Sequence, residues 1–398
     1  MYTGGNSHLD SWRCIFRITK GRRTYVRTYG VTAELAPPEM SRGLPLLLFC
    51  LRSLHQYDCE SQVGRLRMKN RLPIDNTIFP LPLSAMSAQF PDEESDDGEF
   101  ARQEDAFRDW VSNDGSTRYP VQAGRYHLYV SLACPWASRT VIVRHLKGLE
   151  GAIGLTVLDP IRDELGWAFR EGPGYTADPV NGFAYLSEAY TASNPNFAGR
   201  VTVPVLWDKE THRIVNNSED DICLMFDREF AALGTGSVEL FPSDIAKDHA
   251  ALSAEIYEYV NNGVYKSGFA TQQGAYEKAC HLLFDKLDAL ETRLANRRYL
   301  FGKQPVEADW RLFCTLVRFD AVYHGHFKCN IRRIVDYPHL QGYLMDLYQL
   351  PGIAETVNFD HIKRHYYYTH DDINPTRIVP IGPALDLSKP HGREALGG

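Results

Sequence analysis

A cysteine followed by a proline, Cys134-Pro135, has the surroundings of a reactive thiol. It follows Tyr126–Val130, a run of strand-forming residues, and precedes apolar residues at helical spacing. Because proline is favoured in the first turn of a helix, we expect Cys134 to be the N-cap residue, at the positive end of the helix dipole. The thiol should then have a lowered pKa and act as a nucleophile. The alternative, a small buried apolar residue, is our interpretation of the other seven cysteines.

The residue three positions after Cys134 limits the redox chemistry that is available. Dithiol oxidoreductases place a second cysteine there, whereas this chain has Ala137. A mixed disulfide formed at Cys134 would therefore need an external thiol to resolve it.

A proline inside a predicted strand suggests where a peptide could bind. Pro204 lies within residues 202–207, where it removes a donor from the strand ladder. A cis Val203–Pro204 bond would turn the backbone N–H and C=O of Val203 outward, so that both could pair with an extended peptide beside Cys134. An ordinary trans proline in an edge strand is the alternative.

The elements that must position these residues form an α/β domain followed by an all-α domain. Before Pro242 the sequence predicts a β-α-β unit and then a β-β-α unit. The four strands are expected at 126–130, 153–157, 202–207 and 213–215. The first helix begins at Pro135, and the second has Ser218 as its N-cap and runs through Phe230. After Pro242 the strand signals end. Long amphipathic helices such as 273–293 take over.

The beginning of the chain lacks these patterns. The first ~90 residues have no steady period and are interrupted by prolines, which predicts an irregular extension without its own core. Residues 92–99 include six acids in eight positions and are expected to form a solvated tether, with globular structure from about Phe107 onward. We therefore expect an extension at 1–95, an α/β domain at 96–235, and an all-helical domain with a C-terminal extension at 236–398.

The composition excludes several classes of function. The chain has 398 residues, 44% of them apolar, which is typical of a globular protein. Its formal net charge of -7 offers no cationic field to nucleic acid or to anionic lipid. The longest strongly apolar run, residues 44–51, is far shorter than the ~20 residues that span a bilayer as a helix. We expect a soluble protein with neither nucleic acid nor membrane as a partner.

The cysteines point to a reducing, cytoplasmic location, because eight of them are dispersed over a long chain. The chain through Asp75 carries 12 Lys and Arg against 6 Asp and Glu, which leaves mitochondrial import as an alternative. Transit peptides are poor in acidic residues, and this disfavours it.

Several long motifs resemble the glutathionyl-hydroquinone reductases, the Omega-like Xi class of glutathione transferases. The stretches that carry the resemblance are residues 124–137, 202–208, 261–270, 318–323, 326–330, 365–367 and 373–375. Together they cover approximately residues 97 to 393 and leave out the first ~90. The resemblance implies a thioredoxin-like domain that binds glutathione as co-substrate, a helical domain that binds a quinone or hydroquinone conjugate, and a homodimer.

The resemblance also implies a mechanism. Cys134 would attack the sulfur of a glutathionyl-hydroquinone and keep the glutathione as a mixed disulfide, which a second glutathione would release as glutathione disulfide. Tyr265 and Tyr366, with Tyr367 a close alternative, match the tyrosines that lie at the hydroquinone in this family. Phenols suit that task because they donate hydrogen bonds and pack against a ring.

The residues that would bind glutathione follow from the same resemblance. Trp167 would pack on the tripeptide, and Val203 with Pro204 would supply its backbone partner. Where the family has Glu-Ser to hold the γ-glutamyl group, this chain has Ser218-Glu219. A hydroxyl and a carboxylate at a helix N-terminus still suit an anion and an ammonium, but which residue holds which group stays open.

Two other functions are compatible with the same motifs. An Omega-like thioltransferase or dehydroascorbate reductase would share Cys134 but not the stretches around Tyr265 and Tyr366. A non-catalytic ligand-binding protein on the same fold is the third possibility. No metal is expected, because the histidines around His324 and around His361 lack a full ligand set.

Overall fold

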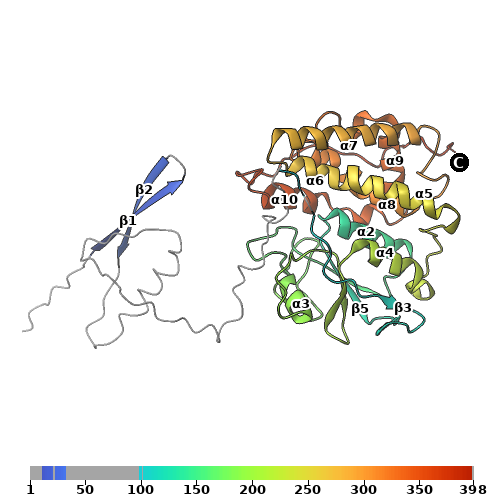
Figure 1. The fold of residues 1–398 in the computed structure, drawn as a ribbon, viewed down its shortest axis with the longest axis horizontal. Coiled ribbons are helices and arrows are strands. Elements are labelled where there is room, and N and C mark those ends of the chain that lie inside the picture. Colours follow the sequence, from blue (N-terminus) through green and yellow to red (C-terminus); the bar gives the residue numbers. More distant parts are fainter. Residues whose placement is uncertain (1–10, 21–22, 33–97, 101, 397–398) are drawn as a thin grey trace, which may run out of the picture. The chain divides into compact units, whose positions relative to one another are not determined.

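The computed structural model describes residues 11–20, 23–32, 98–100 and 102–396. Contacts divide the chain into two units, Met1–Phe79 and Pro80–Gly398. In the first unit, strands β1 (Ser11–Lys20) and β2 (Arg23–Thr32) pair in antiparallel orientation (Figure 1). This two-stranded ribbon was not predicted from the sequence. The expected acidic tether lies, apart from its last two residues, outside the described residues.

A four-stranded mixed sheet organises the α/β part of the second unit, in the order β6–β5–β7–β8. Strand β5 (Tyr126–Val130) is parallel to β6 (Gly154–Val157) and antiparallel to β7 (Val205–Asp208), which pairs with β8 (Arg213–Asn216). The four strands follow one another along the chain as predicted, whereas their order across the sheet was not predicted. Strand β7 begins three residues later than predicted, because Pro204 has no N–H to donate to the ladder.

Helices connect and cover these strands. Helix α2 (Pro135–Leu146) joins β5 to β6, and α4 (Glu219–Arg228) follows β8 and packs against α2 (Figure 1). Helix α3 (Leu186–Ser193), which was not predicted, precedes β7. A short helix, η2 (Phe230–Leu233), ends this part of the chain. The arrangement is that of a thioredoxin-like domain, as predicted.

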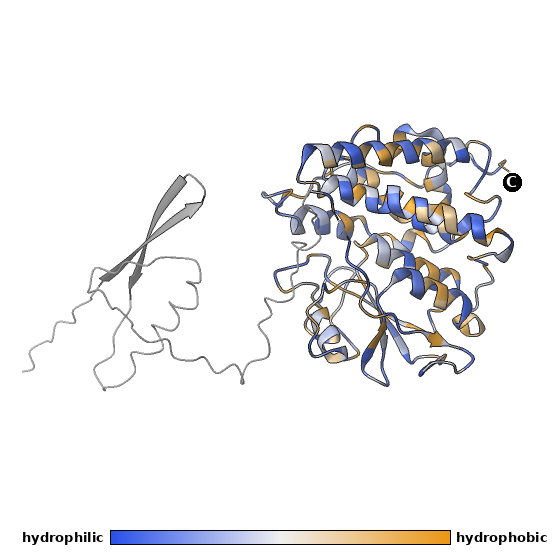
Figure 2. Ribbon diagram, viewed as in Figure 1, coloured by the Kyte–Doolittle hydropathy of each residue, from blue (hydrophilic) through white to orange (hydrophobic). Residues whose placement is uncertain are grey.

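Two short strands that were not predicted, β3 (Val111–Ser112) and β4 (Tyr119–Pro120), pair in parallel before β5. The part of the second unit that follows Pro242 is helical, as predicted. Its elements are η3 (Ser243–Ile245), α5 (Ala246–Ile256), the π-helical turn η4 (Tyr257–Asn261), α6 (Asn262–Gly268), α7 (Gln273–Leu294), α8 (Glu307–Arg318), the π-helical turn η5 (Phe319–Tyr323), η6 (Ile334–Asp336), α9 (Pro338–Tyr348), η7 (Ala354–Thr356) and α10 (Phe359–Thr369). Hydrophilic and hydrophobic residues are mixed along each helix (Figure 2), as expected when one face is buried. None of the described helices has both the length and the apolar composition that crossing a bilayer requires.

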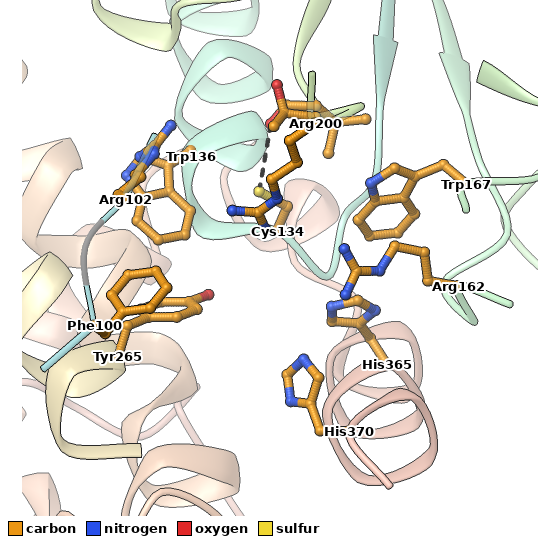
Figure 3. A pocket seen from close by; sticks show the side chains of 12 residues that line it. Phe100, Arg102, Cys134, Trp136, Arg162, Trp167, Arg200, Tyr265, His365 and His370 are labelled. Atoms are coloured by element: carbon orange, nitrogen blue, oxygen red, sulfur yellow. Dashed lines mark hydrogen bonds between the residues drawn. The ribbon is translucent and has the colours of Figure 1, made fainter. Parts of the chain in front are cut away.

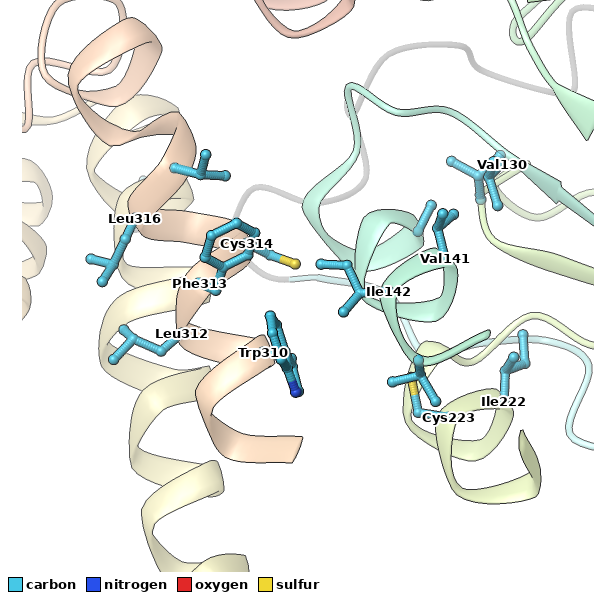
Figure 4. Close-up of a cluster of buried hydrophobic side chains, with 14 of the residues drawn as sticks. Val130, Val141, Ile142, Ile222, Cys223, Trp310, Leu312, Phe313, Cys314 and Leu316 are labelled. Atoms are coloured by element: carbon cyan, nitrogen blue, oxygen red, sulfur yellow. The ribbon is translucent and has the colours of Figure 1, made fainter. Parts of the chain in front are cut away.

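Helix α8 lies at the centre of this unit, and all twelve of its residues are buried. It packs against α2, α5 and α9. Trp310 and Cys314 point from α8 toward Ile142 of α2, so the two domains share one apolar core (Figure 4). A helix buried on every side must also satisfy its polar side chains internally.

Asp309 shows how α8 does so. Its carboxylate accepts hydrogen bonds from the backbone N–H groups of Leu300 and Val306, each at 2.9 Å, and from the Tyr343 hydroxyl at 2.8 Å. The Val306 bond belongs to the first turn of α8, so this one carboxylate caps the helix and ties it to the preceding loop and to α9.

We predict that Asp309→Ala lowers the free energy of unfolding by about 3 kcal/mol or more, because three buried donors lose their acceptor together. Urea unfolding followed by circular dichroism measures the change. Asp336→Ala is the matched control: Asp336 accepts from the Arg333 N–H in the same way but is exposed, so it should cost about 1 kcal/mol or less. Equal losses in the two variants would contradict this role of burial.

Candidate active site

Cys134 has the position that the sequence predicts. It is the N-cap residue of α2, with extended backbone angles and Pro135 in the first turn, and its carbonyl accepts the Ser138 N–H at 3.0 Å. Its side chain is partly exposed, and the sulfur lies 3.7 Å from the carbonyl oxygen of Val203. The Val203–Pro204 peptide bond is cis, which confirms the prediction. The thiol thus faces the backbone carbonyl of Val203.

A cleft with about 580 Å³ of unfilled space opens at Cys134 and is lined from both domains (Figure 3). Its lining residues are Phe100, Arg102, Cys134, Trp136, Arg162, Trp167, Arg200, Thr202, Val203, Tyr265, His365 and His370. Four predicted site residues, Cys134, Trp167, Val203 and Tyr265, are thus brought together. Pro204, Ser218, Glu219 and Tyr366 are not among the lining residues.

The expected lowering of the Cys134 pKa is wrong for this state of the protein. Burial raises the pKa of the thiol above its ordinary value, and the nearby Glu219 carboxylate adds to the rise. The Ala137 N–H and the charges of Arg102 and Arg318 act in the opposite direction but do not outweigh burial. The N-terminus of a helix lowers a thiol pKa, but removing the thiolate from water costs more here.

Tyr265 and Tyr366 belong to a buried cluster of three hydroxyl groups. The Tyr265 and Tyr366 hydroxyl oxygens are 2.5 Å apart, and the Tyr323 hydroxyl lies 2.9 Å from that of Tyr366. Burial raises the pKa of all three phenols, so they are neutral hydrogen-bond donors. Tyr265 lines the cleft, whereas Tyr366 does not line it and contacts the Tyr265 hydroxyl. The Tyr367 hydroxyl instead donates to the carbonyl of Ala321.

Aromatic rings form the walls of the cleft. Trp136 lies 4.7 Å from Tyr265, between ring centroids, and the Arg102 guanidinium lies 4.3 Å from the Trp136 ring. On the other side, Trp167 stacks on His365 at 5.0 Å with an interplanar angle of 16°. Such walls can hold a planar ring and an extended peptide.

The cleft also has cationic and imidazole groups that sequence analysis missed. Arg102, Arg162 and Arg200 come from three separate segments, and no period or motif connects them. Burial lowers the pKa of His365 to about 3 and that of His370 well below its ordinary value, so both imidazoles are neutral near pH 7. Arginines therefore supply the positive charge of the cleft.

Residues before Phe107 contribute to the site, contrary to the expectation that globular structure begins there. Phe100 is 6% exposed and packs against Tyr265 and Phe269 at 6.1 and 5.8 Å between ring centroids. Arg102 lies two residues further on and forms an ion pair with Glu219 at 3.3 Å. The sequence analysis placed the start of globular structure too late, because Phe100 and Arg102 lie beside an acidic, glycine-containing stretch that has no hydrophobic period.

Ser218 is the N-cap of α4, as predicted, although its hydroxyl makes no capping hydrogen bond. Glu219 follows it as the first residue of the helix and is 3% exposed. Its carboxylate forms ion pairs with Arg102 at 3.3 Å and with Arg139 at 3.4 Å. Among the residues that the structure describes, no group of three or more His, Cys, Asp or Glu side chains is arranged to hold a metal ion.

An N-cap cysteine opposite a cis-proline, in a thioredoxin-like domain followed by a helical domain, defines a cysteine-type glutathione transferase. The family described as "Glutathione S-transferase, N-terminal domain" matches residues 133–229, and the corresponding C-terminal domain matches residues 273–344. Both matches fall within the domains described above.

Three relatives narrow the class. Glutathionyl-hydroquinone reductase YqjG of Escherichia coli is 49% identical to this chain, and the alignment covers 77% of this chain and 96% of YqjG. The glutathione-bound structure of YqjG superposes on this one with a TM-score of 0.71 and 50% identity. That superposition covers 73% of this chain and 96% of the YqjG chain. Glutathionyl-hydroquinone reductase PcpF of Sphingobium chlorophenolicum is 46% identical over 74% and 93% of the two chains. A Xi-class enzyme of Natrialba magadii is 51% identical, with a TM-score of 0.71 over 72% and 88%. The chain belongs to the glutathionyl-hydroquinone reductase family, the Xi class of glutathione transferases.

The raised thiol pKa predicts how alkylation of Cys134 depends on pH. A thiol with a pKa above its ordinary value is largely protonated at pH 7, and its thiolate fraction rises about tenfold per pH unit below the pKa. The rate at which iodoacetamide alkylates Cys134, followed by peptide mass spectrometry, should therefore still be rising at pH 9. A plateau below pH 7 would show that the helix terminus outweighs burial.

Proposed function

We propose that the protein reduces glutathionyl-hydroquinones, with Cys134 as nucleophile and glutathione as the second substrate. The observation that carries the proposal is that Cys134, from the thioredoxin-like domain, and Tyr265, from the helical domain, line one cleft. A thiol alone would suit any mixed disulfide. A phenol linked to two further phenols beside the thiol suits a substrate with a hydroxylated ring.

In the first step the Cys134 thiolate attacks the sulfur of the conjugate. A sulfur–sulfur bond forms, the bond between sulfur and the ring carbon breaks, and its electron pair remains on the ring. That carbon takes up a proton, and free hydroquinone leaves. We assign this proton delivery to the Tyr265 hydroxyl, which Tyr366 supports by its hydrogen bond at 2.5 Å.

In the second step a glutathione thiolate attacks the mixed disulfide at the glutathione sulfur. Glutathione disulfide forms, and the Cys134 thiolate is regenerated. Ala137 occupies the position of a resolving cysteine, which agrees with the need for an external thiol. The ring carbon gains two electrons, one from each sulfur of the glutathione disulfide: the sulfur of the conjugate and the thiol sulfur of the second glutathione.

We assign glutathione to the part of the cleft between Val203 and Trp167. The backbone of Val203 would pair with the tripeptide, Pro204 would fix that backbone, and Trp167 would cover the peptide. Arg162 and Arg200 give this part a positive charge that suits the carboxylates of glutathione. Ser218 and Glu219 remain our candidates for the γ-glutamyl group. Glu219 would share its carboxylate between this group and two arginines.

A cytoplasmic location and a homodimer remain proposals. Five cysteines within residues 98–100 and 102–396 are free thiols, which supports a reducing compartment. The homodimer rests on the resemblance alone.

Substitution of Cys134 tests the nucleophile. Cys134→Ser should abolish turnover of a glutathionyl-hydroquinone, because an alcohol does not form the mixed disulfide. Intact-protein mass spectrometry of the native enzyme, after reaction with the conjugate, should show one added glutathione that further glutathione removes. If Cys134→Ser retained turnover, or if the adduct formed at another cysteine, the mechanism would be wrong.

Substitution of Tyr265 separates this function from an Omega-like thioltransferase. Tyr265→Phe removes only a hydroxyl, so kcat on a glutathionyl-hydroquinone should fall about 10²-fold, the typical contribution of a positioned acid. Reduction of a simple mixed disulfide, which has no ring to protonate, should change little. Tyr367→Phe is the matched control and should leave both rates unchanged, since its hydroxyl binds the Ala321 carbonyl. Equal losses on both substrates would favour the thioltransferase.

A further inference from the structure

Arg318, the last residue of α8, is a buried cation whose hydrogen bonds all go to neutral groups. It is 2% exposed. Its Nε donates to the carbonyl of Ala133 at 2.9 Å, Nη1 to that of Cys314 at 2.7 Å, and Nη2 to the carbonyl of Leu132 at 2.8 Å and the hydroxyl of Ser138 at 2.6 Å. Four of its five N–H groups are thereby used. Within residues 98–100 and 102–396, no carboxylate forms an ion pair with it.

Buried arginines of this protein differ in their partners: Arg144 and Arg393 donate to carbonyls, whereas two others have carboxylate partners. Arg125 pairs with Asp208 at 2.7 Å, and Arg139 pairs with Glu307. A guanidinium does not lose its proton in a protein, so the charge of Arg318 persists. A buried charge without a counter-ion is costly. The carbonyl of Cys314, at the negative end of α8, offsets only part of that cost.

The position of this charge connects it to the reaction. Leu132 and Ala133, whose carbonyls Arg318 binds, come directly before Cys134. The charge of Arg318 is among the influences that lower the pKa of the Cys134 thiol and of the Tyr323 and Tyr366 phenols, against the larger effect of burial. The thiol that becomes anionic in the proposed reaction, and the two phenols linked by hydrogen bonds to the proposed proton donor Tyr265, thus lie near one buried cation.

We propose that Arg318 is a positioning residue: it holds the backbone before Cys134 and supplies the counter-charge for the thiolate formed there. This inference rests on the proposed function for its meaning in turnover. Its effect on the thiol is independent of any hydroquinone. Nothing in the fold alone requires a charge at this place, because a neutral side chain of equal volume would avoid the cost of burial.

The other groups around the thiol do not replace Arg318. Arg102 also favours the thiolate, but Glu219 pairs with it at 3.3 Å and itself disfavours the thiolate. The remaining titratable neighbours are Arg162, Arg200, Tyr265, His365 and His370 in the cleft, with Tyr323 and Cys314 behind it. The histidines, phenols and Cys314 are uncharged near pH 7.

Two variants of the full chain separate charge from packing. In Arg318→Met the charge is lost, and alkylation of Cys134 by iodoacetamide at pH 8 should slow about tenfold, which corresponds to a thiol pKa raised by about one unit. In Arg318→Lys the charge remains while hydrogen bonds are lost, so the alkylation rate should stay within about twofold of the native rate although the protein is less stable. Peptide mass spectrometry follows Cys134 alone among the eight cysteines.

Arg393→Met is the matched control. Arg393 is 3% exposed and donates only to carbonyls, those of Leu294, Arg297, Arg298 and His339, away from the cleft. It should lose stability without any change at Cys134. If Cys134 were alkylated at the native rate in Arg318→Met, or tenfold more slowly in Arg318→Lys, the proposal that Arg318 supplies the counter-charge would be wrong. Should Arg318→Met fail to fold, Arg318→Lys decides by itself.

Turnover is assayed separately. Slower alkylation in Arg318→Met together with a native enzyme that leaves glutathionyl-hydroquinones intact would uphold the counter-charge and refute the proposed function. If the native enzyme turned over the conjugate and alkylation of Cys134 were unchanged in Arg318→Met, the proposed function would be upheld and the counter-charge refuted. In the expected case, both kcat and the alkylation rate of Cys134 fall in Arg318→Met relative to the native enzyme. In Arg318→Lys most of kcat and most of the alkylation rate are restored.

Discussion

The carboxyl end of α8 meets the amino end of α2, and the negative pole of one helix dipole lies against the positive pole of the other. Arg318 bridges them, with bonds to the Cys314 carbonyl on one side and to Leu132 and Ala133 on the other. The helical domain therefore holds the loop that presents Cys134. The apolar contact of Trp310 and Cys314 with α2 fixes the same two helices along their length (Figure 4).

A chain of buried ion pairs extends this contact to the rest of the cleft. Glu219 pairs with Arg102 and Arg139, Arg139 also pairs with Glu307, and Arg311 pairs with Glu307 at 3.0 Å. These pairs link the segment before the sheet, α4, α2 and α8. Buried pairs add little net stability, but removing one partner leaves an isolated charge, so each pair strongly opposes any other arrangement of the elements. The two walls of the cleft are thus fixed relative to each other.

The sequence was sufficient where the cause is local. The N-cap position of Cys134 follows from its neighbours, and the positions of the four strands along the chain follow from short apolar runs. It was insufficient where the cause is packing between distant segments. Burial of the Cys134 thiol involves both domains, and this reversed the expected direction of its pKa shift. Arg102 and Arg200 line the cleft from segments without any motif, and Tyr366 contacts the Tyr265 hydroxyl instead of lining the cleft.

A thiol whose pKa is raised by burial can still be the nucleophile when substrate binding changes its hydrogen bonds. The Cys134 thiol lies 3.7 Å from the Val203 carbonyl, an acceptor that only a protonated sulfur can use. In the proposed complex the peptide of glutathione pairs with that same backbone. An amide N–H is a stronger donor than a thiol, so the peptide would displace the sulfur from the carbonyl. The thiol would then lose a hydrogen bond that only its protonated form can donate, while the charge of Arg318 and the N-terminus of α2 would remain. Substrate binding and thiol activation would in this way be one event.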